Sequence, residues 1–231
     1  MFNGEIYEKL GEGIEVKMVK RAGGEAFHAT INGLRVIAKE KKAAISSLWK
    51  DELKPYFGLE KVGMSYFRQE DLFILKFHPN LGTLKASANK VLPEAFGTWF
   101  IRLCIYDYAI QNGDRHSNNI LLISPRRLMA IDEAVSKRPP DLWCPRFSQI
   151  ITDKILQSIA NLVKDRRELE ELVRNEFSSE AIAGIYEVTS RYDDLVGPQT
   201  ISGLEKTIAT VSTGIGWMDY MWAKFGEERY K

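Results

Sequence analysis

The dipeptide Asn32-Gly33, which separates two strand-like segments, is the feature that most constrains the fold of this chain. Asn-Gly favours a two-residue hairpin turn, so the segments on either side should pair as antiparallel neighbours. Another strand-like segment precedes this hairpin, and two more follow it after a helical stretch. We therefore predict a five-stranded antiparallel sheet whose strands cover residues 14–20, 25–31, 34–40, 62–68 and 72–77.

One predicted helix interrupts these strands, and helices dominate the rest of the chain. The first is expected from about Ala43 to Tyr56, because Ile45, Leu48 and Trp49 recur at helical spacing. The pattern predicts an α+β fold with one unit over residues 1–80 and a mainly helical unit over residues 81–231. The later elements expected are helices over 93–111, 148–164, 166–177, 179–192 and 203–225, and two short strands over 119–123 and 127–131.

The composition excludes several classes of protein. Apolar residues make up 45% of the chain and the net charge is +1, which favours a folded core over disorder and gives no overall attraction to nucleic acid or membrane. No apolar run approaches the ~18 residues of a membrane span, and the opening residues do not resemble a secretory signal. With only two cysteines, Cys104 and Cys144, we expect a protein of the reducing cytoplasm with no stable membrane association.

A polar loop at residues 112–119 leads directly into the first of the two short strands. A hairpin brings the outer ends of its strands together, so Asn119 should lie beside Asp132. Their amide and carboxylate oxygens are hard donors that suit Mg²⁺ carried by nucleotide phosphates. Asp114, five residues before Asn119, could orient an attacking hydroxyl and accept its proton.

Upstream residues supply candidates for holding a nucleotide. Lys39 ends the third predicted strand and could contact phosphates if an acidic residue fixes it. Glu52 is the candidate partner, because it lies on the inward stripe of the first helix, where an unpaired carboxylate is costly. The alternative is that the helix frays and Glu52 reaches water. Gly23 and Gly24 could let backbone N–H groups approach phosphates, or could form only a turn.

The sequence Gly-Asp-Arg-His-x-x-Asn at 113–119, followed by Ala-Ile-Asp at 130–132, resembles the catalytic loop of phosphatidylinositol 3- and 4-kinases and of HipA-like kinases. The segments AGGEAF and VIAKEK resemble the N-lobes of RIO-type kinases and of the small KEOPS kinase. The resemblance implies a bilobal protein-kinase-like fold in which Asp114 is catalytic, Asn119 and Asp132 hold Mg²⁺, and Lys39 contacts the phosphates of ATP or GTP.

The chain departs from the regulated protein kinases at two motifs. Asp132 is followed by Glu133 and Ala134 where those kinases have Phe and Gly, and no Gly-x-Gly-x-x-Gly is present. Within the polar loop, Arg115 and His116 are expected to hydrogen-bond and hold its shape rather than to act in catalysis.

Two other functional classes compete with a kinase. A metallohydrolase would need grouped ligands, but the three histidines lie far apart in the sequence. A catalytically inactive binding module of kinase fold should lack at least one charged member of the set, and none is missing.

The acceptor of the phosphate is the least constrained part of the prediction. The compact size and the KEOPS-like N-lobe resemble the small archaeal RNA kinases that phosphorylate a tRNA 2′-hydroxyl. This resemblance favours a hydroxyl of RNA over the hydroxyl of a protein Ser or Thr, and a lipid or small molecule is less favoured. Basic side chains that flank the predicted site could meet RNA phosphates, although ordinary surface charge is the alternative. These are Arg126, Arg127, Lys137 and Arg138.

Overall fold

The computed structural model forms two compact units. Unit 1 comprises Met1–Glu52 and Lys61–Pro79, and unit 2 comprises Leu53–Glu60 and Asn80–Lys231. The switch at residue 79 lies one residue from the boundary expected from the sequence, but the short segment 53–60 belongs to unit 2. The residues described are 4–7, 9, 11–12, 14–23, 26–40, 45–87, 97–110, 112, 115, 117–131, 165–176, 178–193, 196 and 198–213.

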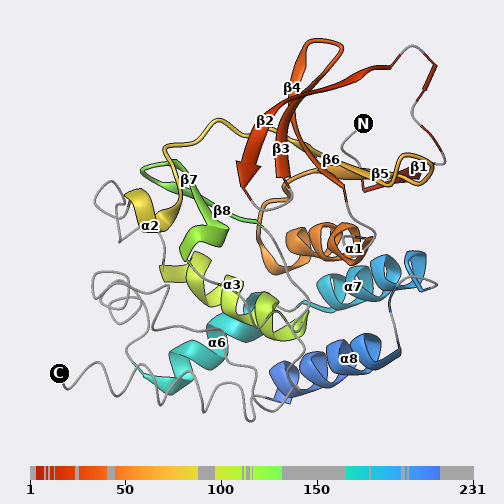
Figure 1. Ribbon diagram of the computed structural model, residues 1–231. Coiled ribbons are helices and arrows are strands. Elements are labelled where there is room, and N and C mark those ends of the chain that lie inside the picture. The colour runs from red at the N-terminus through yellow and green to blue at the C-terminus, as the bar shows by residue number, and fades with distance from the viewer. Residues whose placement is uncertain are drawn as a thin grey trace. The chain divides into compact units, whose positions relative to one another are not determined.

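Unit 1 is built on a six-stranded sheet with the strand order β1-β5-β6-β4-β3-β2 (Figure 1). The five predicted strands are all present as β2 to β6, and they pair antiparallel, which confirms that part of the prediction. The sixth strand, β1, pairs parallel to β5 and has only two residues, too few to show a periodic pattern. The strands are β1 (Ile6–Tyr7), β2 (Val16–Gly23), β3 (Ala26–Ile31), β4 (Leu34–Glu40), β5 (Met64–Phe67) and β6 (Leu72–Lys76).

The Asn32-Gly33 hairpin forms as the sequence predicts. Both residues have positive φ, 48° and 81°, and Ile31 pairs with Leu34 across the turn. One face of the sheet then collects the alternating apolar residues of the paired strands. This core cluster consists of Ala29, Ile31, Val36, Ala38, Phe67, Leu72 and Ile74.

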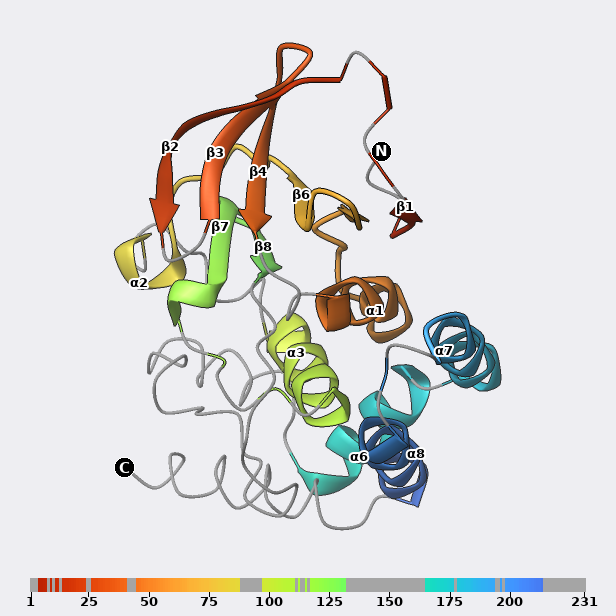
Figure 2. The same cartoon turned by 45° about the vertical axis from the view of Figure 1, so that its right-hand side comes forward.

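Helix α1 (Ile45–Leu53) lies beside the sheet in both ribbon views (Figures 1 and 2) and confirms the predicted first helix. Its inward residues Leu48 and Trp49 are buried. The carboxylate of Asp51 accepts hydrogen bonds from the backbone N–H groups of Val62 and Gly63, at 2.8 and 2.9 Å. These two bonds hold the segment that leads into β5 close to the helix.

Unit 2 combines helices with one hairpin. Strand β7 bonds on one edge to β8 and on the other to the segment before α2, through Leu81 N–H to the Leu122 carbonyl at 2.7 Å and Leu122 N–H to the Gly82 carbonyl at 2.9 Å. Strand β7 is therefore hydrogen-bonded along both of its edges. The elements are η2 (Lys54–Phe57), α2 (Leu84–Ser87), α3 (Gly97–Ala109), η5 (Ser117–Asn119), β7 (Ile120–Ser124), β8 (Arg127–Ala130), α6 (Arg166–Glu176), α7 (Ser179–Arg191) and α8 (Pro198–Thr213).

The predicted helices of unit 2 are found wherever the chain is described. The last one begins at Pro198, five residues before the predicted start at 203, because Pro is well suited to the first turn of a helix. The short elements η2 and α2 were not predicted as separate elements. The predicted helix 148–164 and the end of the last predicted helix, 214–225, lie outside the described residues. Over the described ranges, no helix has the length and apolar character needed to cross a bilayer.

The hydroxyl of Tyr66 makes the free energy of unfolding depend on pH in the alkaline range. Tyr66 stacks on Phe73 with ring centroids 4.4 Å apart, and its hydroxyl donates to Asp71 Oδ1 at 2.7 Å. Burial, followed by the bond to Asp71, raises the pKa of Tyr66 to about 12. The folded state thus keeps a proton that the unfolded chain loses near pH 10, so this contribution is present below pH 10 and is lost as pH rises through about 12.

Replacing Tyr66 by Phe should flatten the loss of unfolding free energy above pH 10, because the titrating group is removed. Urea unfolding at a series of pH values measures this slope. Tyr186→Phe is the matched control, since Tyr186 lies exposed on α7 and should leave the slope unchanged. Equal slopes for wild type and Tyr66→Phe would contradict the prediction.

Candidate active site

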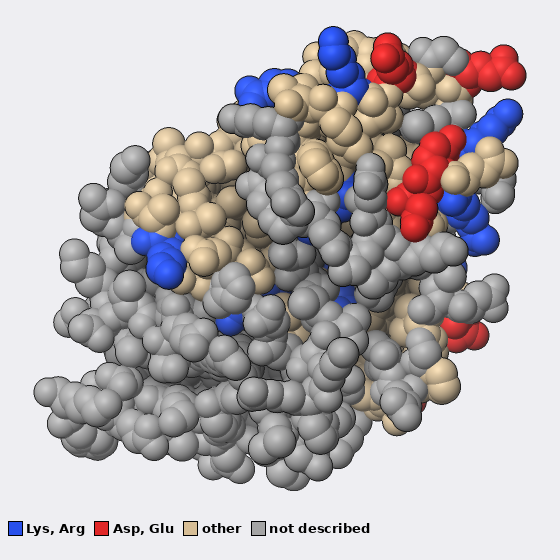
Figure 3. All heavy atoms as spheres, viewed as in Figure 1, with Lys and Arg blue, Asp and Glu red and all other residues tan. Residues whose placement is uncertain are grey.

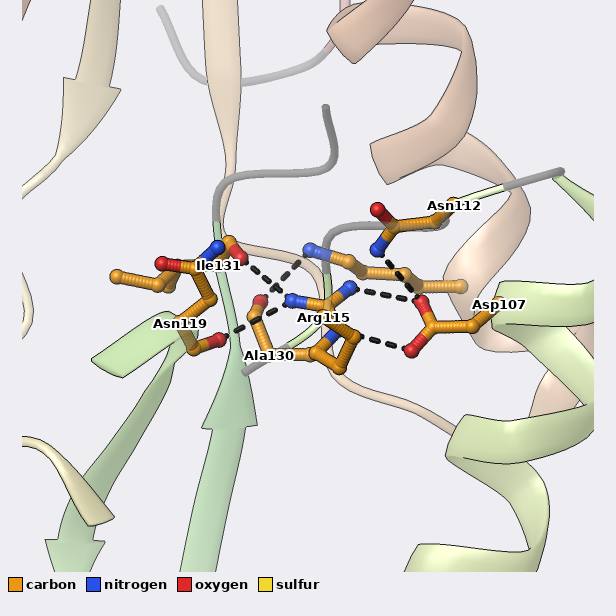
Figure 4. Close-up of polar contacts among 7 residues, drawn as sticks. Asp107, Asn112, Arg115, Asn119, Ala130 and Ile131 are labelled. Atoms are coloured by element: carbon orange, nitrogen blue, oxygen red, sulfur yellow. Dashed lines mark hydrogen bonds and ion pairs between the residues drawn. The ribbon is translucent and has the colours of Figure 1, made fainter. Parts of the chain in front are cut away.

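A buried ion pair between Arg115 and Asp107 organises the polar loop (Figure 4). Both side chains are fully excluded from solvent. Arg115 Nε donates to Asp107 Oδ2 and Nη2 donates to Oδ1, each at 2.9 Å, so the two planar groups meet in a bidentate fork. Asp107 lies on α3, and the pair therefore ties the loop to that helix.

The other guanidinium nitrogen of Arg115 ties the loop to the hairpin. Nη1 donates to the carbonyl oxygen of Asn119 at 3.1 Å and to that of Ile131 at 2.6 Å. The N–H of Ile131 also donates to the Asn119 carbonyl at 2.9 Å. The two outer ends of the hairpin therefore meet at Asn119 and Ile131, and the predicted hydrogen bonding of Arg115 within the loop is confirmed. His116 lies outside the described residues.

Asn112 completes the hydrogen bonding of the Asp107 carboxylate. Its Nδ2 donates to Oδ1 at 2.9 Å, and its backbone N–H donates to the Asp107 carbonyl at 2.8 Å. A buried charge pair is tolerated only when its remaining polar atoms are also satisfied, and Asn112 contributes to this. Sequence reasoning missed Asp107 and Asn112. The signal was there, since Asp107 is the single acidic residue within the apolar α3 sequence.

Asn119 is the predicted metal ligand that the structure describes. It ends η5 and is 7% exposed, so its side chain is a largely buried hard oxygen donor at the open end of the hairpin. Asp132 follows Ile131 directly in the sequence, and Asp114 precedes Arg115; both lie outside the described residues. No group of three or more His, Cys, Asp or Glu side chains suited to a metal occurs among the residues that the structure describes. The oxygen donor of Asn119 fits Mg²⁺, with the carboxylate of Asp132 as the expected second ligand.

Glu52 has a different partner from the one predicted. Its Oε1 lies 2.8 Å from Nζ of Lys61, while Lys39 stands half-buried on β4 and is not the partner of this ion pair. The bonds of Asp51 to the neighbouring backbone explain the correction, because they bring the residues just after Lys61 alongside the helix. The carboxylate does not fray into water either, since Glu52 is only 8% exposed.

The N-terminal segment also lies against Glu52. A Cβ atom added at Gly4 would clash with the side chain of Glu52, and Gly4 has a φ of +80°. Only glycine meets both conditions without strain. Of the two predicted phosphate-loop glycines, Gly23 is the last residue of β2 and pairs with Ala26, and Gly24 lies outside the described residues.

One of the four basic candidates for RNA contact is already engaged. Arg127 Nε donates to Glu60 Oε1 at 2.9 Å, and Nη2 donates to Oε2 at 2.6 Å, which raises the pKa of Arg127. Arg126 is exposed, whereas Lys137 and Arg138 lie outside the described residues. On the face shown in Figure 3, the described basic side chains are separated by other residues rather than gathered in one continuous patch.

The scan against protein families found no family model that matches this chain, and the search of curated proteins found no match either.

Replacing Arg115 by Met should lower the unfolding free energy by about 3–5 kcal/mol, because the Asp107 carboxylate would remain buried without its counter-ion. Adding Asp107→Asn should recover part of this loss, since a neutral amide removes the stranded charge. Urea denaturation measures both variants.

The matched control for this prediction is Arg167→Met. Arg167 pairs with Glu171 at 3.1 Å on the surface of α6, where both side chains are largely exposed. An exposed helical pair of this kind contributes only about 0.3–0.5 kcal/mol. Equal destabilisation by Arg115→Met and Arg167→Met would show that the buried pair does not hold the loop.

Proposed function

We propose that this protein is a phosphotransferase of the protein-kinase-like class, which transfers the γ-phosphate of ATP, or of GTP, to a hydroxyl group. The observation that carries the proposal is the pair of hydrogen bonds from Arg115 Nη1 to the carbonyls of Asn119 and Ile131. Ile131 is the residue immediately before Asp132. A kinase needs an amide and a carboxylate close together, next to a loop that carries the catalytic Asp. The five antiparallel strands β2 to β6 of the unit 1 sheet, with α1 between β4 and β5, support a bilobal kinase fold as part of the proposal.

Each proposed residue has a separate role in the transfer. Asp114 orients the acceptor hydroxyl and takes its proton as the hydroxyl oxygen bonds to the γ-phosphorus and the bond to the leaving nucleoside diphosphate breaks. Asn119 and Asp132 would hold Mg²⁺, which when bound neutralises charge on the phosphate oxygens. Lys39 and the Gly23-Gly24 turn contact the nucleotide phosphates. Glu52 does not act as the partner of Lys39, because its carboxylate is paired elsewhere.

We propose an RNA hydroxyl as the acceptor, with a protein Ser or Thr as the alternative. The support for RNA is the basic character of Arg126, Lys137 and Arg138 close in sequence to Asn119 and Asp132. Arg127 contributes less, because the carboxylate of Glu60 already neutralises it.

Variants of the three site residues should separate metal binding from proton transfer. Asp132→Ala and Asn119→Ala should nearly abolish γ-phosphate transfer, because each removes a metal ligand, and chelation of Mg²⁺ should do the same to the wild type. Asp114→Asn should retain nucleotide affinity and lose rate by roughly 10² or more, the scale expected for a positioned base. Rates from labelled ATP and affinities from calorimetry provide the measurements.

The neighbouring residue Asn118 offers a matched control for the metal ligands. It lies in the same short helix η5 but is exposed, and its Oδ1 accepts a long bond from the Thr83 hydroxyl at 3.5 Å. Asn118→Ala should keep wild-type activity. Full wild-type transfer in the presence of chelator would refute the mechanism, and collapse of nucleotide affinity in Asp114→Asn would show that Asp114 is misassigned. Mg²⁺ and nucleotide binding without any turnover would instead indicate a binding module.

The acceptor can be identified by incubating the protein with labelled ATP, total RNA and total protein. We expect label in RNA, and RNA affinity that falls steeply with salt because bound phosphates release counterions. Neutralising Arg126, Lys137 and Arg138 together should reduce the salt dependence, by about one unit of log–log slope for each phosphate that is no longer bound, and leave ATP affinity intact. Arg127→Gln is the control and should have a smaller effect. Label confined to Ser and Thr of proteins would replace RNA with a protein acceptor.

A further inference from the structure

Two buried cations hold two successive carbonyl groups at the end of β8. Lys54 Nζ donates to the Ala130 carbonyl at 2.9 Å. Arg115 Nη1 donates to the Ile131 carbonyl at 2.6 Å (Figure 4). The next residue in the sequence is Asp132. We propose that Lys54 is a positioning residue, which fixes the chain that delivers the Asp132 carboxylate to the metal; this inference rests on the proposed function.

The burial of Lys54 indicates a specific role. Its side chain is fully buried, at 0% exposure. Removing an ammonium group from water carries a large desolvation cost, which polar partners must offset, whereas a Met side chain of similar length would fill the same space without that cost. A buried lysine is therefore unfavourable as a core-filling residue. It is well suited to holding a carbonyl oxygen in place, because charge-assisted hydrogen bonds are stronger than neutral ones.

The backbone that carries Lys54 is itself firmly placed in unit 2. Phe57, which ends η2, packs edge-to-face on Tyr106 of α3 with ring centroids 5.5 Å apart. Gly58 closes η2 with a φ of +65°, and a Cβ atom there would stand 2.8 Å from Nε of Arg102. The backbone of Lys54 is thus held in place, and its hydrogen bond to Ala130 therefore fixes the position of the end of β8.

Lys54 and Arg115 act on the same strand end from different parts of the sequence. Lys54 comes from η2, and Arg115 comes from the polar loop beside Asn119. The two cations restrain adjacent peptide groups, so the direction of the chain at residue 131 is set as well as its position. Mg²⁺ requires near-ideal octahedral geometry, so small displacements of a ligand weaken its binding. Residues that orient metal ligands typically change metal affinity by about 10–100-fold when they are replaced.

The experiment measures metal affinity independently of turnover. Mn²⁺ is titrated by electron paramagnetic resonance into the full chain with a non-hydrolysable ATP analogue. In Lys54→Met we expect Mn²⁺ affinity to fall about tenfold or more, with nucleotide affinity in chelator unchanged. The Mg²⁺ concentration for half-maximal transfer should rise in parallel. Lys54→Arg, which retains a cationic donor, should bring both values back toward the wild type.

Lys85→Met is the matched control, because Lys85 is an exposed lysine on α2 of the same unit. It should behave as the wild type. Unchanged Mn²⁺ affinity in folded Lys54→Met would overturn the role of Lys54 while leaving the proposed function standing. Wild-type protein that binds neither nucleotide nor Mn²⁺ would overturn the proposed function itself.

A second variant covers the case in which Lys54→Met does not fold. Lys54→Gln is polar, uncharged and shorter, and the same loss of Mn²⁺ affinity is expected. Unchanged affinity there, or failure of both variants to fold, would make Lys54 a purely structural residue and overturn its positioning role.

Discussion

The ion pair between Arg115 and Asp107 is the interaction on which the candidate site depends. A guanidinium group offers several N–H donors in one rigid plane, and this one bonds to a helix, to its own loop and to the end of a strand. Because both charges are fully buried, any loop conformation that separates them leaves an unpaired charge in the interior. The penalty for such alternatives keeps Asn119 and Ile131 together.

In the segment from Asp51 to Gly63, several charged side chains likewise restrain the chain through the partners they bond to. Asp51 caps backbone N–H groups and Glu52 pairs with Lys61 within unit 1. Lys54 bonds to the Ala130 carbonyl and Glu60 pairs with Arg127 within unit 2. These interactions differ in strength, because Lys54 is fully buried whereas Arg127 and Glu60 are about half exposed. The buried interactions therefore restrain this short stretch of chain more than the surface pair does.

In the candidate site, the residues proposed for the chemistry differ from the residues that hold the loop in position. Asn119, Asp114 and Asp132 have the oxygen donors that phosphoryl transfer requires. Among the described residues, Arg115 ties the loop to its surroundings through its pairing with Asp107 and its hydrogen bonds to the Asn119 and Ile131 carbonyls. Preorganisation of this kind lowers the cost of assembling a productive geometry around bound nucleotide.

Much of the fold could be read from local patterns. The turn at Asn32-Gly33 and the alternating segments beside it identified the antiparallel sheet. This was possible because the turn type and the pairing of its two strands depend on residues that are adjacent in the sequence. Helical spacing likewise identified α1, α6 and α7. The two-residue strand β1 and the short helix α2 were missed, since elements of that length have no period to detect.

The sequence by itself determined the pattern of strands and helices, the meeting of the hairpin ends, and the candidate set of Asp114, Asn119 and Asp132. It also indicated that Glu52 would need a cation if it stayed on the inward face of the helix, where an unpaired carboxylate is costly, and left exposure to water as the alternative. Only the tertiary structure decided that this cation is Lys61, and that Lys54 bonds to a carbonyl 76 residues away. Local sequence shows that a buried charge requires a partner, but the partner is chosen by whichever distant segment the packed chain brings within hydrogen-bonding distance.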